Sequence, residues 1–283
     1  MIPAPFEYVR AESVDHAVAA LREHGDEAKV IAGGHSLLPL MKLRLAAPEV
    51  LVDLGRVDAL RGVQETDDGR LAIGAMTRHQ QVMDDPLVQQ YCPVLAHVTG
   101  MVGDAQVRHV GTIGGALAHG DAAGDLPATA LALEATFLVQ GPDGQREVTA
   151  ADFFQDYLVT ALAEDEVLVE VRVPKLDGSW GYRYEKFVRV SQAWAIVGAL
   201  ALVQRDNGSI SQARVGLTNM ATVPLRASAT EQALTGAGTD AIRSAAEAAA
   251  EGTSPSGDLN ATPEYRQHLA RVLTRRAVEA AAS

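Results

Sequence analysis

Two stretches of this sequence decide its fold: Ala32-Gly33-Gly34-His35-Ser36 and Gly111-Thr112-Ile113-Gly114-Gly115. The first follows the apolar run Lys29-Val30-Ile31, which is typical of a strand, and precedes another apolar run over residues 37–41. Glycine lets the backbone approach a ligand closely and adopt a positive φ, so successive N–H groups can converge on one anion. Two such stretches therefore predict a cradle for the diphosphate of one dinucleotide.

Side chains near the glycines support this interpretation. Ser36 and Thr112 carry hydroxyl groups that can join backbone N–H groups on a phosphate. Asp121 and Asp125 follow the second stretch, where a ribose or ribityl chain would offer hydroxyl groups. Alternatively, Asp125 caps a helix that begins close to Pro127. The competing interpretation, in which a glycine pair is only a tight turn, stays open for either pair taken alone.

Other nucleotide-binding and catalytic motifs are missing from the sequence. It contains no G-x-x-x-x-G-K-[ST] loop, and no G-x-G-x-x-G motif opens a helix. The stretch Gly34-His35-Ser36-Leu37-Leu38 lacks the closing glycine of a G-x-S-x-G nucleophile elbow. A P-loop, a Rossmann unit and hydrolase chemistry are therefore disfavoured, and no catalytic residue is predicted.

The two stretches carry a family resemblance. Residues 32–44 and 111–121 resemble the two FAD-binding motifs of the flavoprotein (medium) subunit of molybdenum hydroxylases, in the carbon monoxide dehydrogenase branch. The similarity runs through nearly the whole chain, including residues 186–198 and 264–273. Ala122 stands where the family commonly has a proline. The resemblance implies an FAD that lies extended between two subdomains, with its diphosphate held by the two glycine stretches. Because the sequence offers no convincing His or Cys attachment site, we expect this FAD to be bound non-covalently.

The resemblance also implies which residues contact FAD. The first loop would place Ile31 to Leu37 on the diphosphate, the second would add residues 111–115, and the following turn would lie near the ribityl or ribose portion. By motif position the implied contacts are Ile31, Ala32, Gly33, Gly34, His35, Ser36, Leu37, Gly111, Thr112, Ile113, Gly114, Gly115, His119, Asp121 and Asp125.

Trp194 is a further candidate, because in the family this strand approaches the isoalloxazine ring. An aromatic side chain there can stack on the ring or shield one face. A tryptophan at the start of an apolar strand is more often a core residue. One interpretation of Lys186 and Arg189 places them near the pyrimidine edge of the flavin. The favoured interpretation is that both are exposed cations on a strand.

Composition and charge narrow the remaining classes. The chain has 283 residues and a net charge of −12, which disfavours a nucleic-acid surface. No apolar run reaches the roughly 18 residues of a membrane span, and the N-terminus has no signal region, so a cytoplasmic location is expected. Cys92 is the only cysteine and is interpreted as a small buried hydrophobe. The histidines lack metal-ligand spacing, so no metal is predicted in this chain.

The implied function is electron transfer within a larger complex. By resemblance, a large subunit with a molybdenum-pterin cofactor oxidises the substrate, and a small subunit with two [2Fe-2S] clusters passes electrons to FAD on this chain and on to an external acceptor. A dimer of heterotrimers is the expected assembly. Two alternatives stay open: a self-contained FAD oxidase or dehydrogenase with an inter-domain FAD, and a nucleotide-binding domain without catalytic function. A flavin spectrum and co-purifying subunits discriminate between the three.

The sequence predicts an α+β fold in three parts. Residues 1–55 form a small βαβ-like FAD-binding unit, residues 56–176 a larger α+β unit, and residues 177–283 a three-stranded antiparallel sheet with helices. Ser13 and Gly25 bound the first helix, and Asp206-Asn207-Gly208 predicts a hairpin. Strands are expected at 30–32, 50–54, 71–74, 136–139, 167–173, 181–188, 195–204 and 210–217, and helices at 78–83, 87–98, 227–234, 240–251 and 263–281.

Overall fold

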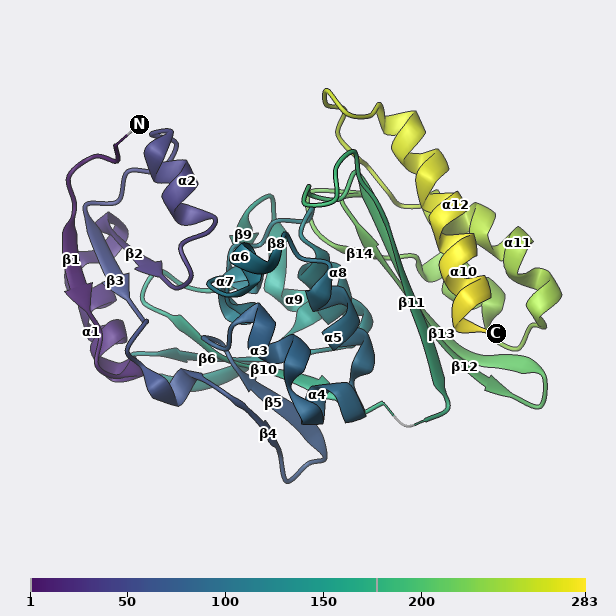
Figure 1. Cartoon of the computed structure of the whole chain (residues 1–283), viewed down its shortest axis with the longest axis horizontal. Coiled ribbons are helices and arrows are strands. Elements are labelled where there is room, and N and C mark those ends of the chain that lie inside the picture. The colour runs from purple at the N-terminus through teal and green to yellow at the C-terminus, as the bar shows by residue number, and fades with distance from the viewer. Residues whose placement is uncertain (1, 177) are drawn as a thin grey trace.

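The computed structural model describes residues 2–176 and 178–283 and has three successive units, each a sheet with helices (Figure 1). As predicted, helices and strands are mixed, and the two larger sheets are antiparallel. The N-terminal unit is a parallel sheet in the order β1-β3-β2, covered by one helix. The Ser13 hydroxyl accepts a hydrogen bond from the His16 N–H at 3.0 Å, and the helix ends at Gly25, whose φ is 54°. Both boundaries agree with the sequence prediction. The elements are β1 (Glu7–Arg10), α1 (Val14–His24), η1 (Gly25–Glu27), β2 (Ala28–Ile31), α2 (Leu37–Lys42) and β3 (Val50–Asp53).

The central unit is an antiparallel sheet in the order β4-β5-β10-β6-β7. Its core contains Phe137 and Phe153, whose ring centroids are 4.3 Å apart. The strands are β4 (Val63–Glu65), β5 (Arg70–Gly74), β6 (Thr136–Gly141), β7 (Gly144–Thr149), β8 (Phe154–Asp156), β9 (Val159–Thr160) and β10 (Val167–Pro174). The helices are η2 (Asp58–Leu60), α3 (His79–Asp84), α4 (Pro86–Tyr91), α5 (Pro93–Gly100), α6 (Ala105–Arg108), α7 (Ile113–Ala118), α8 (Asp125–Ala132) and α9 (Ala150–Phe153).

The structure contradicts one helix that the sequence predicted in this unit. The sequence predicted a single helix over 87–98, but α4 ends at Tyr91 and α5 begins at Pro93. Proline has no N–H and its ring clashes with the preceding turn, so Pro93 starts a new helix. Cys92 at the break is fully buried, and burial raises the pKa of its thiol to about 12. The interpretation of Cys92 as a small buried hydrophobe is confirmed.

The C-terminal unit is a sheet in the order β11-β12-β13-β14, so the predicted count of three strands is corrected to four. The two-residue β14 is too short to leave a pattern in the sequence. Asn207 (φ 48°) and Gly208 (φ 87°) form the predicted hairpin turn. The strands are β11 (Trp180–Phe187), β12 (Val197–Asp206), β13 (Ser209–Thr218) and β14 (Leu225–Arg226), and the helices α10 (Ser228–Leu234), η3 (Thr239–Ala241), α11 (Ile242–Ala245), η4 (Ala246–Ala250) and α12 (Pro263–Ala281).

The helices α10, α11 and α12 cover one face of this sheet, and α8 of the central unit packs on its other face (Figure 1). A Cβ at Gly216 would lie 2.5 Å from the Ala128 carbonyl oxygen, so this glycine permits the close approach of α8. The expected helix over 240–251 is instead η3, α11 and η4. We keep residues 55 and 176 as proposed domain boundaries.

Candidate functional site

The first glycine stretch is a loop between β2, which ends at Ile31, and α2, which begins at Leu37. Gly34 has a φ of 69°, a conformation that glycine adopts without strain. In the part of the chain that the structure describes, the N–H groups of residues 33–36 donate to no protein acceptor, and the Ser36 hydroxyl has no partner. His35 Nδ1 lies 3.0 Å from the Gly33 carbonyl oxygen. Four consecutive free N–H groups and a hydroxyl form a suitable nest for a phosphate.

The second glycine stretch opens a short helix and is therefore not only a tight turn. Residues 113–118 form α7, with Thr112 as its N-cap: the Thr112 hydroxyl accepts from the Gly115 N–H at 3.2 Å. The Gly114 N–H donates to the Ala75 carbonyl at 2.9 Å, and the Ile113 N–H donates to the Thr77 carbonyl at 3.0 Å. The protein therefore engages the N–H groups of Gly111, Ile113, Gly114 and Gly115, and among the described residues the Thr112 N–H has no protein acceptor, so the contact of this stretch with a phosphate stays a prediction.

The structure brings the two glycine stretches into contact. A Cβ at Gly33 would lie 2.5 Å from the Val110 carbonyl oxygen and 2.8 Å from the Gly111 Cα. A Cβ at Gly114 would lie 2.7 Å from the Ala75 carbonyl oxygen. The missing side chains at Gly33 and Gly114 thus allow segments of the protein to pack against one another.

His79 lies buried behind the second stretch and was not identified from the sequence. A Cβ at Gly111 would lie 2.9 Å from His79 Cδ2 of the imidazole, and the backbone N–H of His79 donates to the Gly111 carbonyl at 2.9 Å. Burial, together with the positive charges of His35 and Arg108, lowers the pKa of His79 to about 4. Its Nδ1 has no hydrogen-bond partner within residues 2–176 and 178–283. His79 is therefore a neutral imidazole at pH 7.

His119 and Asp121 lie in the turn after α7, a few residues beyond the second glycine stretch. Gly120 has a φ of 68°, and Asp121 Oδ1 accepts from the Ala123 N–H at 2.8 Å. Both side chains are partly exposed. Burial lowers the pKa of His119, and the Asp121 carboxylate opposes this shift. Ala122 is buried in this turn in place of the family's proline.

Asp125 is buried and already paired, which corrects two expectations. It is the first residue of α8, whose N-cap is Gly124, so it is not the cap. Its Oδ2 accepts from Lys186 Nζ at 2.7 Å, and its Oδ1 accepts from the Tyr184 hydroxyl at 2.7 Å. The Lys186 side chain is 4% exposed, so the favoured interpretation as an exposed cation is wrong. Each carboxylate oxygen of Asp125 accepts from one protein donor and keeps a further lone pair, so its contact with the sugar stays a prediction.

This buried cluster joins the central and C-terminal units. Lys186 Nζ also donates to the Met101 carbonyl at 3.0 Å, and the Tyr184 hydroxyl lies 3.3 Å from Thr218 Oγ1. Burial raises the pKa of Asp125, while the Lys186 ammonium opposes that rise. Burial also raises the pKa of Tyr184 well above its usual value. The cluster therefore holds α8 against β11 with a charged pair that has no access to water.

Trp194 lies in the segment between β11 and β12, where 57% of its surface is exposed. The alternative interpretation of Trp194 as a core residue is wrong. Arg189, in the same segment, is exposed as favoured, but it follows β11 rather than lying on it. Asn219 links this segment to the turn after α7: its N–H donates to the Ala122 carbonyl at 2.8 Å, and its Nδ2 donates to the Ala195 carbonyl at 2.8 Å. No spacing pattern in the sequence points to Asn219.

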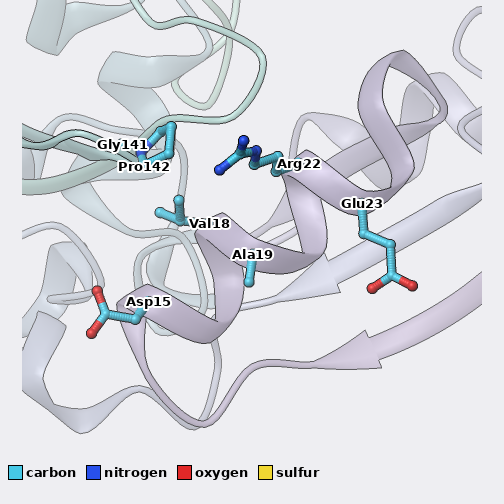
Figure 2. A pocket seen from close by; sticks show the side chains of 7 residues that line it. All are labelled: Asp15, Val18, Ala19, Arg22, Glu23, Gly141 and Pro142. Atoms are coloured by element: carbon cyan, nitrogen blue, oxygen red, sulfur yellow. The ribbon is translucent and has the colours of Figure 1, made fainter.

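A hollow elsewhere on the surface contains none of the predicted site residues. It measures about 560 Å³ and lies between α1 and the turn at Gly141 and Pro142. Figure 2 shows the Arg22 side chain extending toward that turn, with Asp15 and Glu23 at the two ends of the helix segment. The hollow is open to solvent, and none of its lining residues belongs to either glycine stretch, so we do not place the cofactor there.

The residues present fit FAD. The nest at residues 33–36 supplies N–H donors for a phosphate, and the exposed Trp194 supplies a flat apolar surface for an aromatic ring. The turn at residues 119–124 is joined to the Trp194 segment through Asn219. A dinucleotide with a phosphate and a flat ring needs both kinds of surface.

Comparisons with known proteins identify the family to which this chain belongs. Residues 4–176 match the FAD binding domain in molybdopterin dehydrogenase, and residues 182–281 match the CO dehydrogenase flavoprotein C-terminal domain. This chain belongs to the family of FAD-binding medium subunits of molybdenum hydroxylases. In the part of the chain that is described, no helix is long and apolar enough to cross a membrane, and no group of His, Cys, Asp and Glu could hold a metal ion.

Individual relatives cover the whole length of the chain. The carbon monoxide dehydrogenase medium chain of Hydrogenophaga pseudoflava is 41% identical over 99% of this chain and 98% of its own. A solved carbon monoxide dehydrogenase from the same organism, lacking the Mo-pyranopterin moiety, has a chain that matches with a TM-score of 0.97 and 43% identity, over 99% of this chain and 98% of that one. Quinoline 2-oxidoreductase from Pseudomonas putida 86 matches with a TM-score of 0.94 and 33% identity, over 100% of this chain and 98% of that one.

Proposed function

We propose that this chain is the electron-transfer subunit of a molybdenum hydroxylase: it holds FAD, receives electrons from [2Fe-2S] clusters on a small partner subunit, and delivers them to an external acceptor. The observation that carries the proposal is the phosphate nest at residues 33–36, packed against the second glycine stretch. FAD accepts electrons singly or in pairs and supplies the redox chemistry, and the protein supplies binding, orientation and solvent exclusion.

Each part of the proposed site has one task. The N–H groups of residues 33–36 and the Ser36 hydroxyl bind the diphosphate, and Thr112 orders α7 beside them. The turn at His119 and Asp121 lies along the ribityl portion. Trp194 covers part of the isoalloxazine ring. Ile31, Ala32, Leu37, Gly111, Ile113, Gly114 and Gly115 support the two stretches by packing, and Asp125 lies near the ribityl or ribose portion while its carboxylate holds Lys186.

The proposed partners follow from the relatives and from this chain's own residues. The Hydrogenophaga relative is named a medium chain, which denotes one chain of several. One buried cysteine cannot supply the thiolate ligands of a [2Fe-2S] cluster, so those centres belong to another subunit. We place the molybdenum-pterin cofactor and the substrate site on a large subunit, in a dimer of heterotrimers located in the cytoplasm.

A reconstitution tests this function. Substrate-dependent dye reduction is measured for the chain alone, for the two partner subunits together, and for all three, with carbon monoxide, an N-heterocycle and an aldehyde as substrates. Only the three together should sustain dye reduction through FAD. Bleaching of the flavin absorbance by a substrate in the isolated chain would favour the self-contained oxidoreductase, and a colourless protein that binds no added FAD would favour the non-catalytic domain.

Acid precipitation tests the mode of attachment. The site has no cysteine near the glycine stretches, and His35 Nδ1 is engaged by a backbone carbonyl. Non-covalent FAD should therefore remain in the supernatant after the protein is precipitated with acid. Yellow colour retained in the washed pellet would contradict this expectation.

A further inference from the structure

The segment that carries Trp194 is held mainly at its two ends, and between them Arg189 Nη1 makes one long hydrogen bond of 3.5 Å to Asn260 Oδ1. It leaves β11 at Phe187 and returns to β12 after Ile196, and the Ile196 N–H closes its base by donating to the Phe187 carbonyl at 2.8 Å. Between these ends, residues 189–192 and Trp194 are exposed. A segment with so few buried contacts can adopt other conformations unless its base is held.

Two side chains from distant parts of the sequence hold that base. Asn219 Nδ2 donates to the Ala195 carbonyl at 2.8 Å and to the Ile196 carbonyl at 3.4 Å. Arg266, on α12, donates from Nη1 to the Ile196 carbonyl. The carbonyl groups directly after Trp194 are therefore bound from both sides, by an amide and by a guanidinium.

Each of the two side chains is itself fixed. Asn219 has a φ of 62°, a left-handed conformation, and its N–H donates to the Ala122 carbonyl at 2.8 Å. Arg266 is 2% exposed, and its Nη2 donates to Asp258 Oδ2 at 2.8 Å. Asp258 in turn accepts from the Asn260 N–H at 2.8 Å, which orders the loop before α12. A buried guanidinium bound to a carboxylate and a carbonyl has a single orientation.

We propose that Asn219 and Arg266 are positioning residues that set Trp194 against the isoalloxazine end of FAD. Asn219 holds the Trp194 segment at a fixed distance from the turn at Ala122. The inference rests on the proposed FAD-binding function and deepens it. Because the backbone N–H of Asn219 binds the turn after α7 and its side-chain amide binds the residue after Trp194, one residue fixes the separation between the ribityl region and the ring-covering residue. The diphosphate nest at residues 33–36 makes no contact with either positioning residue in the described hydrogen bonds.

The test uses the full chain loaded with FAD, in a Trp180→Phe background so that Trp194 is the sole tryptophan. Asn219→Gly keeps the left-handed backbone and removes the amide. Asn207→Gly is its matched control, because Asn207 also has a positive φ but lies in the exposed β12–β13 hairpin. The readouts are the FAD dissociation constant, the quenching of Trp194 fluorescence by FAD, and the visible flavin spectrum.

Asn219→Gly should shift the equilibrium between docked and released Trp194 about tenfold toward release, because two hydrogen bonds are lost. Trp194 quenching should then fall and the flavin spectrum should change, while the dissociation constant rises by no more than about tenfold, the size of the docking shift, because the diphosphate nest is unchanged. Asn207→Gly should match the parent in all three readouts.

Arg266→Lys gives an independent variant, since it keeps the charge and loses one of the two directed contacts. It should reduce Trp194 quenching, whereas Arg271→Lys should not, because the partly exposed Arg271 side chain on the same helix donates to the Glu247 carbonyl and not to the Trp194 segment. Circular dichroism confirms that each variant is folded, and the Arg266 pair decides the outcome if Asn219→Gly does not fold. Quenching in Asn219→Gly and Arg266→Lys equal to that of their controls would overturn the inference. So would a parent protein that binds FAD without quenching Trp194. Absence of FAD binding by the parent would instead refute the proposed function.

Discussion

Replacing Gly33 with alanine tests the contact between the two glycine stretches. The added Cβ would lie 2.5 Å from the Val110 carbonyl oxygen, whereas real Cβ atoms essentially never approach closer than 3.0 Å. The stretches must therefore separate by at least about 0.5 Å. Overpacking of this kind costs about 1–3 kcal/mol. Without FAD the loop can relieve the clash by moving, but FAD bound across both stretches requires them to close again.

The FAD dissociation constant of Gly33→Ala should therefore rise by about tenfold to a hundredfold, at about 1.4 kcal/mol for each factor of ten. Gly178→Ala is the matched control, because a Cβ there meets nothing within 4 Å. The assay titrates FAD into each apoprotein and follows the quenching of flavin fluorescence, and urea unfolding of the apoproteins measures their stability separately. A dissociation constant for Gly33→Ala within twofold of that for Gly178→Ala would refute the packing argument.

Three further variants or measurements test the surroundings of the site. The pKa of His79, about 4, lies below the usual 6.5, so the unfolded chain takes up a proton first as the pH falls from 6.5 and stability is lost between pH 6.5 and 4. From pH 7 to 5 His79→Gln should lose about 2 kcal/mol less free energy of unfolding than the parent, and equal losses would contradict the buried neutral imidazole. Asp125→Ala should destabilise the protein by about 3–5 kcal/mol, because it leaves the Lys186 charge buried and unpaired. Adding Lys186→Met should restore part of that loss in the urea midpoint, and purely additive losses would argue against the pair. Cys92 should react with a thiol reagent only after unfolding, because it is fully buried, and rapid modification of the native protein would refute this placement.

The local signals in the sequence determined much of the fold. Ser13 and Gly25 bound α1, the turn at Asn207 joins β12 to β13, and α12 spans Pro263 to Ala281 as predicted, because caps, left-handed turns and a proline at a helix start act over a few residues. The glycine motifs likewise identified the family, which the comparisons confirm. Such features are legible because neighbouring residues are enough to define them.

Only the tertiary structure decided which groups the site has available. The sequence could not reveal that Gly33 packs on Val110, since the two lie far apart along the chain. Nor could it reveal that Lys186 is buried against Asp125, because a lysine on a strand is charged and exposed unless another element supplies a carboxylate. Asn219 has its role because β13 ends where the turn at Ala122 meets the Trp194 segment. Short-range propensities set the elements, and long-range packing determines which polar groups are left free for FAD.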